Sequence, residues 1–79
     1  MPASAARLRY DRDSDRWCLC GQSLHCGDGL EVQVAGRWLP VRIEYTDRHG
    51  WVLLADDDRC RILPSTCLPA RPDRHDGRW

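Results

Sequence analysis

The sequence contains no lysine, no asparagine and no phenylalanine, so all twelve basic residues of this 79-residue chain are arginines. The missing residues have AT-rich codons whereas arginine and alanine have GC-rich ones, and a GC-rich coding sequence is a sufficient explanation. Twelve acidic residues balance the arginines and give a formal net charge of zero. A neutral chain has no overall field that attracts nucleic acid or an anionic membrane, so any such binding must be local.

Long apolar runs are missing as well. No stretch approaches the roughly 18 apolar residues of a membrane span, and Met1–Arg7 lack the apolar centre of a secretion signal. These absences predict a cytoplasmic protein. The cysteines number five, an odd count that argues against an extracellular disulfide framework. A chain of this length makes one domain and buries only about 60% of its unfolded surface, too little for a large enclosed active site.

The clearest structural pattern runs from Trp38 to Thr46. Residue types alternate strictly along this stretch, as they do in a half-buried strand. A turn at 47–50 and an apolar run at 51–55 complete a β-hairpin whose second strand needs cover on both faces. The expected core face consists of Leu39, Val41, Ile43 and Tyr45, and the opposite face of Trp38, Pro40, Arg42, Glu44 and Thr46.

Shorter strands are predicted on both sides of this hairpin. They are separated by charged or glycine-containing turns, including a two-residue turn at Ala35 and Gly36 in which Gly36 takes a positive φ. Flexible tails are expected at 1–6 and 70–79. The shorter strands are expected at residues 7–10, 16–20, 23–26, 30–34 and 60–63, with Leu8, Tyr10, Trp17 and Leu19 directed to the core.

Five or six short strands joined by tight turns are typical of a small antiparallel sheet that bends into a barrel. The sequence therefore predicts an all-β fold, an SH3-like barrel over residues 7–69, with a one-turn helix at 63–69. An OB-like barrel is the alternative, although that fold usually needs a longer chain.

The five cysteines allow more than one interpretation. Four sulfurs, or three with the imidazole of His25, would hold a zinc ion tetrahedrally, but their spacing differs from the short knuckle of structural zinc sites. Alternatively, the cysteines are small buried apolar residues, or two of them form a disulfide on oxidation. The candidate zinc ligands are Cys20, Cys26, Cys60 and Cys67, and the candidate buried cysteines are Cys18, Cys26, Cys60 and Cys67.

No catalytic constellation is visible in the sequence. His25 and Cys26 are neighbours, but adjacent residues of a strand point to opposite faces, so the imidazole is badly placed to take the thiol proton. The acidic residues lie in turns or project singly from strands, and no phosphate-binding glycine motif is present. The sequence therefore predicts a protein that is not an enzyme and needs no cofactor.

The outward face of the central strand is the candidate binding surface. Tryptophan and arginine are enriched at the hot spots of protein interfaces, although a tryptophan here also fits the cap of a bent sheet. The candidate partner-binding residues are Trp38, Arg42 and Glu44, with Arg37 and His49 at the two ends. A nucleic-acid platform is the alternative, in which bases stack and phosphates bind on Trp38, Trp51, Arg42 and the arginines of the tail.

Several short motifs are specific in combination. They are Tyr10-Asp11, Arg16-Trp17, Leu24-His25-Cys26-Gly27-Asp28, Leu30-Glu31-Val32, Trp38, Arg42-Ile43-Glu44-Tyr45 and Trp51. Through these motifs, residues 8–55 resemble the small bacterial proteins of domain-of-unknown-function family 5348. The resemblance implies an SH3-like β-barrel carried by phages and other mobile genetic elements, and it implies no known activity. The cysteines other than Cys26 and the arginine-bearing tail depart from the pattern, so nothing is implied about them.

These observations together predict a non-enzymatic protein-binding module. The most concrete hypothesis is an inhibitor of a bacterial defence complex, similar to an anti-CRISPR protein that binds a CRISPR effector. It is motivated by the small size, the missing catalytic constellation and the mobile-element origin that the resemblance implies. A nucleic-acid-binding small barrel and a zinc-stapled structural module are the alternatives.

Overall fold

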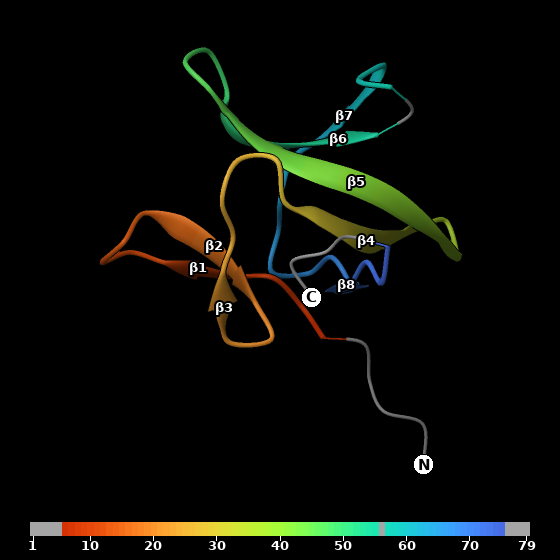
Figure 1. Cartoon of the computed structure of the whole chain (residues 1–79), viewed down its shortest axis with the longest axis horizontal. Helices are drawn as coiled ribbons and strands as arrows, with labels where there is room; N and C mark the ends of the chain where they lie inside the picture. The colour runs from red at the N-terminus through yellow and green to blue at the C-terminus, as the bar shows by residue number, and fades with distance from the viewer. Residues whose placement is uncertain (1–5, 56, 76–79) are drawn as a thin grey trace.

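A computed structural model describes residues 6–55 and 57–75, which form eight strands in two antiparallel sheets (Figure 1). The smaller sheet has the order β1-β2-β3 and consists of β1 (Arg9–Asp11), β2 (Arg16–Leu19) and β3 (Gln22–Ser23). The larger sheet has the order β7-β6-β5-β4-β8 and consists of β4 (Gly29–Val34), β5 (Arg37–Thr46), β6 (Gly50–Ala55), β7 (Cys60–Ile62) and β8 (Ala70–Pro72). The all-β prediction is confirmed, while the predicted tail residues 1–5 and 76–79 lie outside the described residues.

The described strands do not close into the predicted barrel. β7 and β8 are the two edges of the larger sheet, and the smaller sheet has a separate ladder. The cause is the brevity of β3, which ends after two residues. The chain then crosses to the larger sheet, where the Gly27 N–H donates to the Ile43 carbonyl at 2.8 Å just before β4 begins. The hydrogen-bond ladder is therefore interrupted between β3 and β4.

The predicted helical turn at 63–69 is also wrong. This stretch is an irregular connection with one tight turn, in which the Leu68 N–H donates to the Ser65 carbonyl at 3.2 Å. Pro64 and Pro69 explain the difference, since a proline disfavours helical conformation in the residue before it. Because the described residues form no helix, none is long and apolar enough to cross a membrane.

The central hairpin is confirmed as β5 and β6, paired in the register Tyr45 to Trp51 and Thr46 to Gly50. Val41 and Ile43 are buried as predicted, and Leu39 packs against them. The Tyr45 side chain, however, is 52% exposed, and Tyr10 is 41% exposed. Both tyrosines were expected in the core. Alternation correctly identifies the face of a strand, but not how far along the strand the core extends.

A single hydrophobic core joins the two sheets. Side chains from the smaller sheet and its connection pack against the inner face of the larger sheet, and Trp17 and Trp51 are half-buried beside them. Both sheets therefore contribute to the same core. The core consists of Leu8, Leu19, Leu24, Leu30, Val32, Val41, Ile43, Leu53, Ala55 and Ala70.

Ala70–Pro72, which the sequence pattern places in a tail, form β8 and pair with β4. Ala70 is fully buried, and its N–H donates to the Ala6 carbonyl at 2.7 Å. Arg7 adds an isolated bridge to Pro69 and a hydrogen bond from Nη1 to the Cys67 carbonyl at 2.7 Å. Hydrogen bonds and a β-bridge thus connect the segment before β1 to the segment before β8.

The two-residue turn between β4 and β5 is confirmed, and both of its residues have a positive φ, 51° at Ala35 and 77° at Gly36. An alanine in this conformation costs roughly 1 kcal/mol, because its Cβ approaches the following carbonyl, whereas asparagine tolerates it. We expect Ala35→Asn to raise the free energy of unfolding by about 0.5–1 kcal/mol in urea titrations. Ala35→Val should lower it, and a reversed order would contradict this turn geometry.

Candidate functional site

The outward side chains of β5 and their neighbours form one continuous face, which we call the outer sheet face. Its members are placed by the strand register, since directly paired residues project on the same side of a sheet. Glu31 lies opposite Pro40 and Arg71, and Arg42 lies opposite Leu54. The outer sheet face consists of Glu31, Trp38, Pro40, Arg42, Glu44, Leu54 and Arg71.

Arg42 holds the centre of this face through two ion pairs. Its Nε donates to Glu44 Oε2 at 2.7 Å, and its Nη2 donates to Asp58 Oδ1 at 2.9 Å. Asp58 comes from the turn between β6 and β7, where its φ is 69°. The hydrogen bond to Glu44, followed by the attraction of Asp58, raises the pKa of Arg42 above its ordinary value. The guanidinium is therefore charged and held in one orientation.

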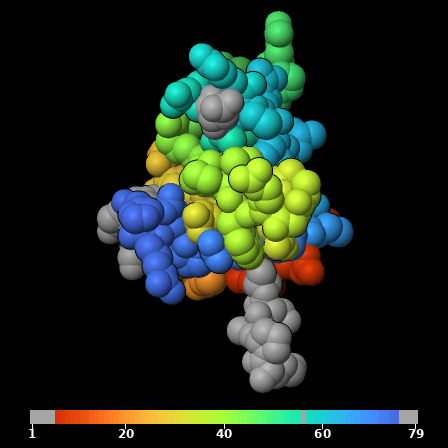
Figure 2. Space-filling model, turned by 90° about the vertical axis from the view of Figure 1, so that its right-hand side faces the viewer, coloured from red at the N-terminus to blue at the C-terminus, as the bar shows by residue number. Residues whose placement is uncertain are grey.

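Trp38 is covered by a guanidinium from the other end of the chain. The Arg71 guanidinium carbon lies 4.1 Å from the centroid of the Trp38 ring, a cation–π contact. The Nε of Arg71 also donates to Glu31 Oε1 at 2.7 Å. Figure 2 shows the blue C-terminal segment on the same face of the molecule as the yellow-green start of β5. One face of the indole ring is therefore already occupied.

A hollow of about 360 Å³ opens beside Arg42. The strands β5 and β6 supply most of its apolar wall, and the turn after β6 supplies acidic side chains at its rim. An open hollow with a mixed polar and apolar lining fits one side chain of a protein partner better than a complete small molecule. The lining residues are Pro40, Val41, Arg42, Leu54, Ala55, Asp57 and Asp58.

Three of the five predicted partner-binding residues share this face, and two do not. Arg37 pairs with Val34 at the start of β5, and the alternation places it on the opposite side from Trp38. His49 lies in the turn after β5, where its N–H donates to the Thr46 hydroxyl at 3.0 Å. Sequence analysis missed Arg71, Glu31 and Asp58, because their contacts depend on pairings between distant segments.

Four other aromatic side chains gather where the two sheets meet. The ring centroids of Tyr10 and Trp17 are 5.4 Å apart, and those of Tyr45 and Trp51 are 5.1 Å apart. The Trp51 indole N–H donates to the Asp15 carbonyl at 3.0 Å and so ties the hairpin to the smaller sheet. By register, Trp51 projects with Tyr45 on the inner side of the sheet, away from Trp38. The predicted nucleic-acid platform of Trp38 and Trp51 is therefore not assembled.

The cysteines fit neither the zinc interpretation nor the buried one. All five are unpaired thiols; Cys18 is half-buried and the other four are exposed, so the prediction of buried cysteines is wrong. Within residues 6–55 and 57–75, no three histidine, cysteine or acidic side chains lie close enough together to hold a metal ion. The candidate zinc ligands Cys20, Cys26, Cys60 and Cys67 are thus not brought together.

Comparison with known proteins supports the family assignment and gives no activity. No curated protein and no solved structure matches the chain. The family model described as a domain of unknown function (DUF5348) matches residues 6–71, which span both sheets from Ala6 to β8 and include every residue of the outer sheet face. The chain therefore belongs to the DUF5348 family.

Proposed function

We propose that this protein is a non-enzymatic protein-binding module and that the outer sheet face contacts the partner. The carrying observation is the arrangement of Trp38, Arg42 and Arg71 on one face, where ion pairs and a cation–π contact hold them. Of these three residues, Arg42 also lines the hollow. Side chains that are ordered before binding lose less conformational entropy when a partner docks. Tryptophan and arginine are also the residue types that contribute most at protein interfaces.

The charges of this face favour a protein over a nucleic acid as partner. The ion-pair network contains two basic side chains, Arg42 and Arg71, against three acidic ones, Glu31, Glu44 and Asp58. A phosphate that approaches either arginine also meets the carboxylates bound there, and their negative charge opposes it. A stacked base would have to displace Arg71 from the ring face of Trp38 that it covers. Mixed charges in fixed positions instead suit a protein surface of complementary pattern.

Within this class, the proposed partner is a bacterial defence complex in the cytoplasm, such as a CRISPR effector. The basis is the association with phages and mobile elements that is expected for the family, together with the small size of the chain. An inhibitor of this kind needs no catalytic activity, only a surface that blocks the effector. The outer sheet face would supply that surface.

The test is capture of the tagged protein from a bacterium that carries CRISPR and other defence complexes, with and without nuclease, followed by binding to the purified complex. We expect a nuclease-resistant, stoichiometric partner. Trp38→Ala should weaken its affinity by about 30-fold, which corresponds to roughly 2 kcal/mol for a hot-spot residue. Arg42→Ala should also weaken binding, because it removes the centre of the ion-pair network.

The matched control is Leu63→Ala, since Leu63 is 65% exposed and lies outside the outer sheet face. It should bind as the unmodified protein does. Far-UV circular dichroism checks that each variant is folded. The proposal fails if Trp38→Ala and Arg42→Ala bind as tightly as Leu63→Ala, or if nuclease removes the partner.

A further inference from the structure

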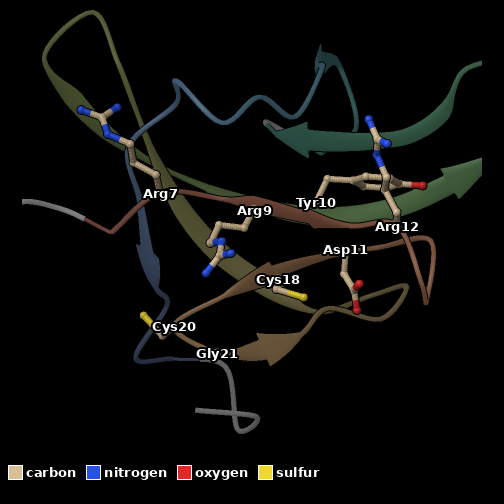
Figure 3. Close-up of a pocket in the computed structure, with 8 residues that line it drawn as sticks. All are labelled: Arg7, Arg9, Tyr10, Asp11, Arg12, Cys18, Cys20 and Gly21. Carbon is tan, nitrogen blue, oxygen red and sulfur yellow. The ribbon is translucent and has the colours of Figure 1, made fainter.

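A second hollow, of about 310 Å³, lies on the smaller sheet, around the outer edge of β1 (Figure 3). Arg9 and Cys18 are directly paired across β1 and β2 and so project on one side of this sheet, while Tyr10 projects on the other. The hollow therefore wraps around an edge strand and is accessible from both sides. We call it the β1 hollow, and its lining residues are Arg7, Arg9, Tyr10, Asp11, Arg12, Cys18, Cys20 and Gly21.

The β1 hollow has an excess of positive charge, with three arginines and a single carboxylate. That carboxylate belongs to Asp11 and is already engaged, because its Oδ1 accepts the Asp13 N–H at 3.1 Å and its Oδ2 accepts the Ser14 hydroxyl at 2.8 Å. The Asp11 carboxylate thus stabilises the turn between β1 and β2. The arginines of the hollow are therefore not neutralised by it.

The side chains of Arg9 and Arg12 make no ion pair and no hydrogen bond in the part of the chain that the structure describes, and both residues are exposed. This distinguishes them from Arg42 and Arg71, which carboxylates hold on the outer sheet face. Arg7 uses Nη1 for the Cys67 carbonyl, but a guanidinium has further N–H groups to donate. The β1 hollow thus offers unused donors to an anion.

We propose that the β1 hollow binds a phosphate group of a nucleotide or of a single-stranded nucleic acid. The planar guanidinium fork matches phosphate oxygens, and arginine is the preferred residue for such contacts. Arg7 and Arg9 are two positions apart along an extended chain, about 7 Å, so each can meet a separate phosphate. This site is independent of the protein-binding face proposed above, because it lies on the other sheet and shares no residue with it.

Tyr10 favours a phosphate that carries a base over a bare phosphate ion. Its ring is 41% exposed, lines the same hollow and packs on one side against Trp17 at 5.4 Å between centroids. Figure 3 labels both Tyr10 and Arg12 among the residues that line the hollow. A base attached to a phosphate held by Arg12, in the turn after β1, can stack on this ring, and stacking of this kind tolerates any base.

The first test measures fluorescence anisotropy of a labelled short oligothymidylate, with inorganic phosphate and a thymidine nucleotide as competitors. With three arginines engaged, the slope of log affinity against log salt should be about −2, and affinity should fall about 20-fold between about 50 and 200 mM salt. The double variant R9A/R12A should reduce the slope to about −0.7. Competition by the nucleotide as strong as by the strand would identify a free nucleotide as the ligand.

The matched control is the double variant R48A/R59A. Both residues are exposed in turns of the larger sheet, outside the β1 hollow, and the variant loses the same two charges. It should retain the slope of the unmodified protein. Equal loss of binding in the two variants would show that only overall charge matters, and would overturn the proposal.

The thiols supply a second measurement within the same molecule. Cys20 is exposed and lines the β1 hollow, whereas Cys60 is exposed on β7 and outside it. Bound oligothymidylate or nucleotide should slow alkylation of Cys20 by iodoacetamide and leave that of Cys60 unchanged, as read by peptide mass spectrometry. No binding by anisotropy at low salt, or a Cys20 alkylation rate unaffected by either ligand, would refute the site.

Discussion

Leu19→Ala is expected to lower the free energy of unfolding by about 3–5 kcal/mol, the range for truncating a fully buried leucine. Leu19 lies in β2 and is fully buried in the core shared by both sheets. A domain of this size is stable by only roughly 5–12 kcal/mol, so the variant loses a large part of its stability. Because the core is common, the smaller sheet should not melt separately. Urea titrations followed by tryptophan fluorescence and by far-UV circular dichroism should coincide.

The comparison variant is Leu63→Ala, in which the same atoms are removed from a side chain that is 65% exposed. We expect a change within about 0.5 kcal/mol. If Leu19→Ala instead produced two separate transitions, with the larger sheet unaffected, the two sheets would be independent units and the single core would be wrong.

Removing the chain after Pro69 is expected to be about as damaging, on the order of 3 kcal/mol, because it deletes β8. Three residue pairs with β4 are lost, and Leu30 and Val32, which are fully buried, lose their neighbouring strand. The edge of β4 then presents unpaired N–H and carbonyl groups, a template for pairing with another chain. The shortened protein should therefore melt earlier and associate, as measured by thermal scanning and light scattering at several concentrations.

The control ends at His75 and keeps every strand of the larger sheet. It should melt within a few degrees of the full chain and remain dispersed. If both shortened chains behaved alike, β8 would contribute nothing to the domain, and the contact between Arg71 and Trp38 would lose its structural basis.

The elements that could be predicted are those whose conformation is specified by residues close together in the sequence. The alternation from Trp38 to Thr46 and the Ala35-Gly36 pair both specify their structure within a few residues, and β5 and its turn agree with them. β8 could not be predicted, because Ala70–Pro72 have no period of their own and two prolines nearby. Its strand conformation comes from pairing with β4, about forty residues earlier in the chain.

The same distinction applies to the candidate sites. An even number of positions separates Trp38, Arg42 and Glu44 on one strand, so their side chains share a face. This spacing can be read directly from the sequence. The partners that hold them, Asp58 and Arg71, are brought in by tertiary structure. The β1 hollow was missed for a related reason. Its arginines stand out only once the structure shows which other arginines are already paired.

The contact between Arg7 and the segment around Cys67 has a consequence for the order in which this chain folds. β4, β5 and β6 are joined by short turns, so their pairing needs little loop closure, whereas Arg7 must reach a carbonyl 60 residues away. We therefore expect the three-stranded meander to form early and the junction of the two chain segments to form last. Until that junction closes, the nascent meander exposes the β4 edge, and a slow final step leaves time for association with other copies.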